Sequence, residues 1–310
     1  MPTLTQLEYI VAVDRLRHFA KAAEACCISQ PSLSMQIQKA EKEIGFALFD
    51  RHKKPVLPTT KGRAFVDQAR IVLNEHRHLL HLSHSRRSEV SGAFRLGVIP
   101  TLAATSIPGF LSIFSEKYPK VDLSIDEMKT ERIIHALRND SLDAGLLSTP
   151  LHEAGIVEQV LFQEPFFLYV NPRHALANRA AVDLKDLEGG RMWLLEDGHC
   201  FKNQVVRFCS SAKLTGAYAN IHFEGGSLET LRQLVKQSPS FTLVPELFIH
   251  HLPSAERKTM IRPFRAPMPS REVSLAFRRN HWKKEIIAAL RQSILDSLPR
   301  TLHSSTLPLL

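Results

Sequence analysis

The sequence predicts an α/β protein built from a helical N-terminal module, one long helix and a larger α/β domain. Two observations lead to this prediction. Residues 4–44 carry apolar side chains at helical spacing, and apolar, β-rich runs alternate with helical patterns from residue 94 onward. The chain has 310 residues, of which 44% are hydrophobic, so it can form two or three domains with cores of their own.

The positive charge is concentrated near the N-terminus. The formal net charge is +9, and residues 1–91 supply +5 of it, because they hold 14 Lys+Arg against 9 Asp+Glu. Such an excess favours a polyanionic partner. The first residues do not form a secretory signal, and no apolar run approaches the ~18 residues that span a bilayer. We therefore expect a cytoplasmic protein without a membrane partner, in which a structural disulfide would be unusual.

The segment 29–45 predicts a recognition helix. Ser29 is a natural N-cap, Pro31 suits the first turn, and Gly45 suits the C-terminus. An apolar stripe at steps of four, three and four residues comprises Leu33, Ile37, Ala40 and Ile44. Helix-turn-helix proteins place short polar side chains from the start of such a helix at base edges. The residues that we predict to contact DNA are Gln30, Pro31, Ser32, Ser34, Met35, Gln38 and Lys39.

The stretch FDRHKKPVLPTTKG, residues 49–62, predicts a two-stranded wing beside the phosphate backbone. It contains five basic side chains if its histidine is counted, and prolines that exclude helix. We predict that Arg51, Lys53 and Lys61 contact phosphates and, with Lys39, make DNA binding steeply dependent on salt. The alternative is a small helical domain with a solvated charged face.

A nearly 30-residue helix is predicted from Thr60 to about Ser88, because no proline or glycine follows Gly62 there. Its narrow apolar seam predicts a partner helix. The seam comprises Phe65, Ala69, Val72 with Leu73, His76, Leu79 and Leu80. Ser91-Gly92 breaks the pattern, so we place a domain boundary there.

The remaining chain predicts parallel sheets covered by helices. Strands are expected at 94–99, 121–127, 143–148, 166–170, 192–196, 221–224, 241–245 and 273–277, and helices at 103–118, 131–139, 227–237 and 281–297. Hydroxyl residues at the ends of predicted strands, Thr101, Thr130 and Ser227, suit a small polar or anionic ligand beside helix N-termini. The alternative for each is plain N-capping. No glycine-rich phosphate loop is present, and we expect no cofactor.

Two segments resemble a known family. HFAKAAEACCISQPSLSMQIQKAEKEIGFALFDR and LPTTKG are similar to the winged helix-turn-helix of LysR-type transcriptional regulators. The resemblance implies a dimer joined through the long helix, followed by a regulatory domain of two α/β subdomains like a periplasmic binding protein. The implied domains are 1–60 (DNA binding), 61–91 (linker) and 92–310 (regulatory). Within the last, subdomain I takes about 92–163 and 269–300, and subdomain II about 164–268.

The four cysteines fall into two pairs. Cys26 and Cys27 are adjacent within the helix-turn-helix, and we expect both to be core residues. Cys200 and Cys209 would lie about 13.5 Å apart on one helix, whereas a disulfide needs roughly 5.5–6 Å between Cα atoms. A disulfide would therefore require a second conformation, which would make oxidation a signal. A zinc site from His199, Cys200, Cys209 and His222 matches no common spacing, and we expect no metal.

The block LLEDGHC-x8-C, with GVIPT before it and SLETLR after it, resembles the hydrogen-peroxide-sensing members of the family. The resemblance implies that Cys200 is the peroxidatic cysteine and Cys209 the resolving one, with Thr101, Thr130 and His199 lining the peroxide pocket. It also implies a tetramer (a dimer of dimers), promoter DNA and RNA polymerase as partners, and a thiol reductant such as a glutaredoxin or thioredoxin. Asn203 stands where better-known members have an acidic residue, which removes any proton relay there.

Three functions compete. The leading hypothesis is a non-enzymatic transcriptional activator switched by peroxide. A second is a LysR-type regulator that responds to a small molecule in the inter-subdomain crevice. A third, from another class, is a thiol peroxidase, which would turn over repeatedly with a reductant.

Overall fold

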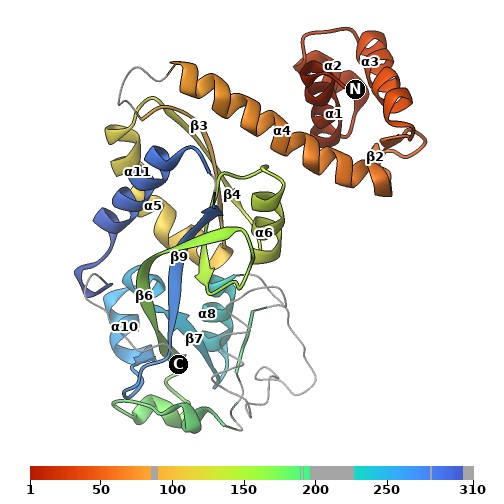
Figure 1. Cartoon of the computed structure of the whole chain (residues 1–310). Helices are drawn as coiled ribbons and strands as arrows, with labels where there is room; N and C mark the ends of the chain where they lie inside the picture. Colours follow the sequence, from red (N-terminus) through yellow and green to blue (C-terminus); the bar gives the residue numbers. More distant parts are fainter. Residues whose placement is uncertain (85–89, 189, 191, 196–226, 280, 303–310) are drawn as a thin grey trace. The chain divides into compact units, whose positions relative to one another are not determined.

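A computed structural model describes residues 1–84, 90–188, 190, 192–195, 227–279 and 281–302. The chain divides into two compact units, Met1–Glu89 with Arg138–Ser141, and Val90–Leu137 with Leu142–Leu310. Each unit is described by itself (Figure 1).

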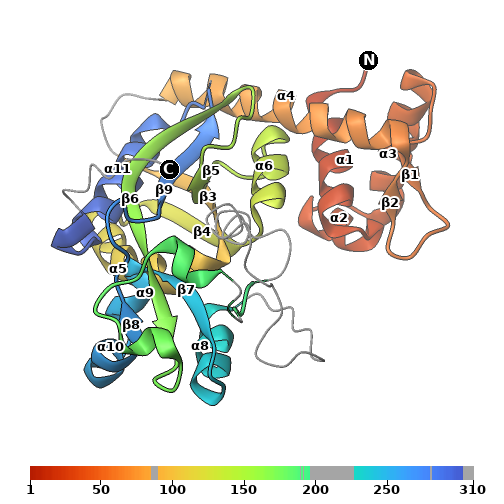
Figure 2. The same cartoon turned by 90° about the horizontal axis from the view of Figure 1, so that it is seen from below.

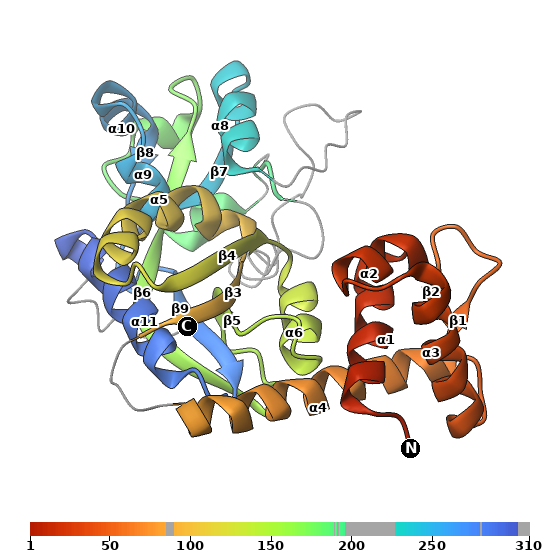
Figure 3. The ribbon, with the colours of Figure 1, turned by 90° about the horizontal axis from the view of Figure 1, so that it is seen from above.

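The first unit holds the winged helix-turn-helix (Figure 3). Its elements are α1 (Leu4–Leu16), α2 (Phe19–Ala25), α3 (Gln30–Ile44), β1 (Phe49–Asp50), β2 (Leu57–Pro58) and α4 (Thr60–His84). Thr3 and Gln6 form a capping box at the start of α1. Apolar side chains of α1, α3 and α4 form one core, with Ile10, Leu33 and Ile37 fully buried. The wing strands pair antiparallel, with Phe49 opposite Pro58.

Some apolar side chains of helix α4 are buried and others are exposed to solvent. Ala69 and Leu73 are buried in the core of the first unit. Val72, Leu79 and Leu80 are 39%, 65% and 47% exposed. Part of the predicted seam, Ala69 and Leu73, therefore packs in the core of the first unit. Other apolar side chains of the seam, Val72, Leu79 and Leu80, are exposed to solvent. The predicted end near Ser88 falls outside the described residues.

The pair Cys26–Cys27 differs from its prediction. Cys26 is partly buried against the core, but Cys27 is exposed. Cys27 lies in the turn between α2 and α3, where the chain leaves the helical core, and has a left-handed φ of 54°. The expectation that both cysteines are core residues was thus wrong for Cys27.

The second unit contains a seven-stranded sheet within its described residues, in the order β4-β3-β5-β9-β6-β7, with β8 pairing β6. The strands are β3 (Gly92–Val98), β4 (Val121–Glu127), β5 (Ala144–Thr149), β6 (Ile156–Val170), β7 (Phe241–Pro245), β8 (Ile261–Arg262) and β9 (Ser270–Arg278). Strand β3 is parallel to β4 and β5, whereas β9 is antiparallel to both β5 and β6. The predicted parallel pairing is therefore confirmed for β3 with β4 and β5 but is wrong for the pairs that β6 and β9 form, because an alternating pattern does not reveal the direction of a returning strand.

Strand β6 is longer than predicted. It begins at Ile156 rather than at residue 166, because its first half also pairs with β9. The polar residues in that half kept the sequence pattern from predicting a strand there. The expected strand at 192–196 is only an isolated bridge from Met192 to Phe241 among its described residues. The expected strand at 221–224 lies outside the described residues.

Helices cover the sheet around two hydrophobic cores. The helices are α5 (Pro100–Lys117), α6 (Thr130–Arg138), α8 (Leu228–Gln237), α9 (Glu246–His250), α10 (Ser254–Met260) and α11 (Lys284–Ser297), with short 3-10 turns η1 (Ala175–Asn178), η2 (Leu184–Leu187) and η3 (Arg300–Leu302). One core packs under α5 and α11, and the other under α8 and α10. Strands β6 and β9 run side by side and join the two halves (Figure 2). Within the described residues, no helix is long and apolar enough to cross a membrane.

Candidate nucleic-acid interface and regulatory site

Helix α3 forms as the sequence predicts. The Ser29 hydroxyl accepts a hydrogen bond from the Ser32 backbone N–H at 3.3 Å, and Gly45 ends the helix with a φ of 82°. The buried side is Leu33, Ile37 and Ala40. The predicted DNA contacts lie outside the core: Gln30, Pro31, Met35, Gln38 and Lys39 are exposed, and Ser32 and Ser34 are half-buried. The helix thus offers a polar surface with one exposed methionine.

Two of the predicted phosphate contacts, Lys53 in the wing and Lys61 directly after it, are exposed. Lys53 lies 3.8 Å from the Asp50 carboxylate, and Lys61, in the first turn of α4, has its Nζ 6.0 Å from the Phe46 ring centroid. Arg51 behaves differently, because it turns back onto α3. Its Nη1 donates to the Ser34 hydroxyl at 3.0 Å and its Nη2 to the Glu41 carboxylate at 2.9 Å.

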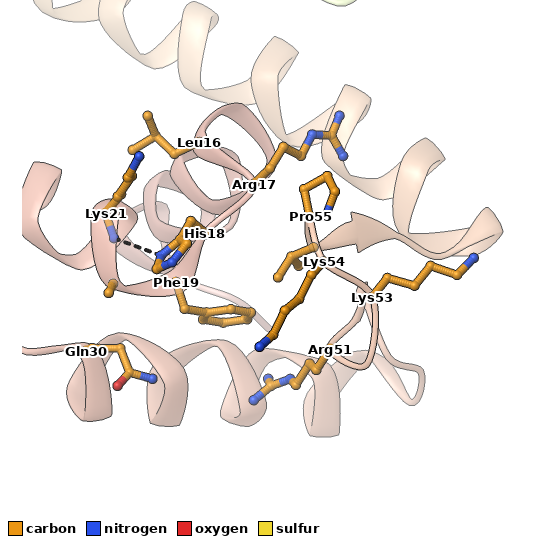
Figure 4. Close-up of a pocket in the computed structure, with 12 residues that line it drawn as sticks. Leu16, Arg17, His18, Phe19, Lys21, Gln30, Arg51, Lys53, Lys54 and Pro55 are labelled. Carbon is orange, nitrogen blue, oxygen red and sulfur yellow. Dashed lines mark hydrogen bonds between the residues drawn. The ribbon is translucent and has the colours of Figure 1, made fainter.

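A basic cavity of about 570 Å³ lies between the start of α2, the start of α3 and the wing (Figure 4). Phe19 and Gln30 line it together with Arg51 and Lys54. Lys53 and Lys54 both line the cavity, and Figure 4 shows the Lys54 amino group directed toward Phe19, Gln30 and Arg51, whereas the Lys53 amino group extends away from these three residues. This arrangement places positive charge beside the first turn of α3, where a DNA backbone would pass.

Lys54 is a residue that sequence reasoning passed over. It was counted among the basic side chains of the wing, but a linear pattern cannot tell which lysine of a pair points inward. His18 was also missed. Its Nδ1 accepts a hydrogen bond from the Lys21 backbone N–H at 3.4 Å and so caps α2 beside the cavity (Figure 4). The signal was its position directly before the alanine-rich helix.

In the second unit, Thr101 lies at the start of α5 and is only 4% exposed. Its hydroxyl accepts a hydrogen bond from Arg271 Nη1 at 2.8 Å. Thr101 is not the N-cap of α5, which is Ile99, so plain capping does not explain this hydroxyl. A buried arginine instead holds it in place.

Arg271 belongs to an ion pair that the sequence did not predict. Arg271 and Glu164 both have fully buried side chains, and Arg271 Nη2 lies 2.7 Å from Glu164 Oε2. The other oxygen of Glu164 accepts from the Leu247 backbone N–H at 2.9 Å. Arg271 Nε donates to Glu164 Oε2 at 2.8 Å, and hydrogen bonds of this kind offset the cost of burying the two charges. Here those bonds link β6, β9, α9 and the start of α5.

A small cavity of about 150 Å³ adjoins Thr101. Thr105, Glu127, Ser227 and Glu229 also line it. Ser227 occupies the N-cap position of α8, but its side chain makes no capping hydrogen bond. The cavity thus brings together two of the three hydroxyl residues that the sequence singled out.

Among the described residues, Thr130 is the other residue predicted for the peroxide pocket, and it is not brought together with Thr101. Thr130 begins α6, is half-buried, and does not line the small cavity in the described part of the chain. His199, Cys200 and Cys209 lie outside the described residues. Among the described residues, no group of three or more His, Cys, Asp or Glu side chains could hold a metal ion.

These features define a class of protein. Residues 4–63 match the family described as bacterial regulatory helix-turn-helix protein, lysR family, and residues 87–299 match the LysR substrate binding domain. The chain belongs to the LysR family of bacterial transcriptional regulators and, within it, to the OxyR-like hydrogen-peroxide-inducible activators.

Individual relatives are similar over nearly the whole chain. A hydrogen peroxide-inducible genes activator of Haemophilus influenzae is 34% identical over 95% of this chain and 99% of its own length. The DNA-binding transcriptional dual regulator OxyR of Escherichia coli is 36% identical over 89% of each chain.

Solved structures agree with this placement. A full-length OxyR variant from Pseudomonas aeruginosa has a TM-score of 0.85 and 31% identity, and covers 99% of this chain and 98% of its own. An H2O2-bound OxyR mutant from Corynebacterium glutamicum has a TM-score of 0.61 and 28% identity, covering 96% of this chain and 92% of its own.

Proposed function

We propose that this regulator senses hydrogen peroxide directly, through a reversible disulfide between Cys200 and Cys209, and thereby activates antioxidant genes. The observation that carries the proposal is the HC-x8-C block in a chain that matches a hydrogen peroxide-inducible activator over 95% of its length. Cationic neighbours favour the reactive thiolate, and His199 and Lys202 flank Cys200 in the sequence.

The proposed chemistry has three balanced steps. The Cys200 thiolate attacks one peroxide oxygen, the O–O bond breaks, and a proton converts the leaving hydroxide to water. The Cys209 thiol then attacks the Cys200 sulfenic acid, which forms the S–S bond and releases a second water. A dithiol reductant of the glutaredoxin or thioredoxin class restores both thiols by exchange and is itself oxidised.

Thr101 suits the peroxide pocket because its hydroxyl is already oriented. A threonine hydroxyl has one hydrogen to donate and two lone pairs. Arg271 occupies one lone pair, so the hydrogen can serve an oxygen acceptor such as peroxide. We assign Thr130 and His199 to the peroxide pocket on the family resemblance, although Thr130, at the start of α6, does not line the small cavity beside Thr101.

DNA binding supplies the output. In our proposal Gln30, Ser34 and Met35 read base edges, with Pro31, Ser32 and Gln38 beside them, while Lys39, Lys53, Lys61 and Lys54 contact phosphates. Arg51 belongs to the same interface. The exposed apolar residues of α4, Val72, Leu79 and Leu80, suit a second copy of that helix in a dimer. Two dimers then form the tetramer that engages promoter DNA and RNA polymerase.

The runner-up is a regulator that binds a metabolite beside Thr101. The small cavity measures about 150 Å³, whereas small-molecule sites usually measure ~300–1,000 Å³. This size favours a ligand as small as peroxide. The thiol peroxidase hypothesis predicts repeated turnover with a reductant. It leaves the DNA-binding module without a role, because catalytic removal of peroxide does not require DNA.

The test is transcription from a target promoter with and without peroxide. Wild-type protein should activate on addition of peroxide, and Cys200→Ser should not, while both bind DNA. The matched control is Cys27→Ser, which removes an exposed thiol from the other unit and should respond as wild type does. Full peroxide response in Cys200→Ser would refute the proposal, and activation of that variant by a metabolite would establish the runner-up.

A further inference from the structure

Arg51 leaves the wing and is bound on three sides by other residues of the helix-turn-helix. Besides its bonds to Ser34 and Glu41, its guanidinium carbon lies 5.0 Å from the Phe19 ring centroid. Glu41 is itself fixed, because its second oxygen accepts from the Leu48 backbone N–H at 2.8 Å. The Arg51 guanidinium is therefore held in one orientation against α3, whereas a surface arginine without such contacts would be flexible.

The consequence falls on the Ser34 hydroxyl. One of its lone pairs is taken by a charge-assisted bond from Arg51 Nη1 at 3.0 Å. The hydroxyl hydrogen must then point elsewhere, and it has no acceptor among the residues that the structure describes. The arginine charge also polarises the O–H bond and strengthens it as a donor. Ser34 sits on the half-exposed side of α3, between Gln30 and Gln38.

We infer that Arg51 is a positioning residue, which orients the Ser34 hydroxyl as a hydrogen-bond donor toward an acceptor on a base edge in the major groove. The acceptors available there are purine N7, guanine O6 and thymine O4, whereas adenine N6 and cytosine N4 present donors. Arg51 thus contributes to base preference through Ser34 and does not act as a phosphate contact. The inference rests on the proposed DNA recognition by α3.

The two roles of Arg51 predict opposite behaviour. A phosphate contact contributes equally to all DNA sequences and to the salt dependence, with a change of ~0.9 in the slope of log K against log salt for each contact. A positioning residue affects discrimination at one base pair and leaves that slope unchanged. A lysine at position 51 would keep the charge, but it could not bridge Ser34 and Glu41 with a planar fork.

The experiment measures affinities of the full-length protein for its operator, for operators with single base-pair substitutions and for unrelated DNA, across salt concentrations. The variants are Arg51→Lys, Arg51→Ala, Ser34→Ala and the double variant Arg51→Ala/Ser34→Ala. The matched control for lost charge is Lys185→Ala, which removes an exposed lysine from the second unit. Thermal unfolding of each variant verifies that the helix-turn-helix is intact.

Each Arg51 variant and Ser34→Ala should lose about fivefold to tenfold discrimination at the same base pair, which is the value of one hydrogen bond. The double variant should lose no more than either single variant. Analogues that lack one acceptor, 7-deazapurines, 2-aminopurine or 5-methyl-2-pyrimidinone, should weaken wild-type binding at that base pair and leave Ser34→Ala unaffected.

Three results would overturn the inference. These are full discrimination by Arg51→Lys, a fall of about 0.9 in the salt slope of Arg51→Ala, or additive losses in the double variant. Failure of the wild-type protein to bind DNA at all would instead refute the proposed function, so the two failures are distinguishable.

Discussion

Replacing Glu256 with glutamine is expected to destabilise the second unit by about 2–3 kcal/mol at neutral pH. The Glu256 carboxylate, on α10, accepts from Arg232 Nε at 2.6 Å and Nη2 at 2.7 Å, and also from the Tyr169 hydroxyl. These hydrogen bonds, led by those from Arg232, lower the pKa of Glu256 from 4.5 to about 2 against the opposing effect of burial.

The magnitude follows from that pKa. At ~1.4 kcal/mol per pKa unit, a carboxyl with a folded pKa of about 2 and an ordinary value of 4.5 contributes about 3 kcal/mol. The side chain is only 10% exposed, so solvent screening is small. Because the folded pKa is depressed, the contribution is complete above pH 4.5 and is lost as the pH falls toward 2. Glutamine retains one acceptor oxygen, which explains the slightly smaller expected loss.

The assay is urea unfolding of the reduced full-length protein, with Glu229→Gln as the matched control. Glu229 also bonds Arg232, at 2.6 Å, but is 54% exposed, so its loss should cost under ~1 kcal/mol. Between pH 5 and pH 3, wild type should lose about 2 kcal/mol more than Glu256→Gln does. Equal effects of the two substitutions, or identical pH dependence of wild type and Glu256→Gln, would refute the reasoning. Helix α8, which carries Arg232, begins two residues after residues 196–226, the part of the sequence that contains Cys200 and Cys209.

Three other predictions concern the sites. Thr101→Val should slow peroxide-driven disulfide formation about tenfold, because it removes one oriented hydroxyl; an unchanged rate in quenched-flow alkylation would contradict this. Iodoacetamide at about pH 8 should modify Cys27 faster than Cys26, because burial raises the pKa of the Cys26 thiol; peptide mapping over time measures both rates, and equal rates would count against it. Lys54→Ala should lower the salt slope of DNA binding by about 0.9, and Lys53→Ala by less, because Lys53 lies 3.8 Å from the Asp50 carboxylate and its amino group extends away from Phe19, Gln30 and Arg51; equal slopes would rule out this difference between the two lysines.

The recognition helix was predictable because its signals are local. Ser29, Pro31 and Gly45 act within one turn of the helix ends, and the apolar stripe needs only a 3.6-residue period. The long helix α4 was likewise predictable from its sequence. Which of its apolar side chains are buried and which are exposed was not. Whether Leu73 or Leu79 is covered depends on where α1 lies, which is a tertiary contact.

The buried centre of the second unit was not predictable from patterns. Glu164 and Arg271 are 107 residues apart in sequence, and charged residues usually face solvent. Only the antiparallel pairing of β6 with β9, in which Glu164 lies opposite Arg271, brings them together. Motifs singled out Thr101, yet its partner Arg271 could be found only in the folded chain.

The most direct test of the central claim is differential alkylation with mass spectrometry, before and after one molar equivalent of hydrogen peroxide. The account predicts a rapid and selective shift of Cys200 and Cys209 into one intramolecular disulfide, with Cys26 and Cys27 still alkylated as thiols. If Cys200 and Cys209 remain alkylatable, or all four cysteines oxidise slowly and without selectivity, the disulfide switch is wrong and a LysR-type regulator with another signal remains.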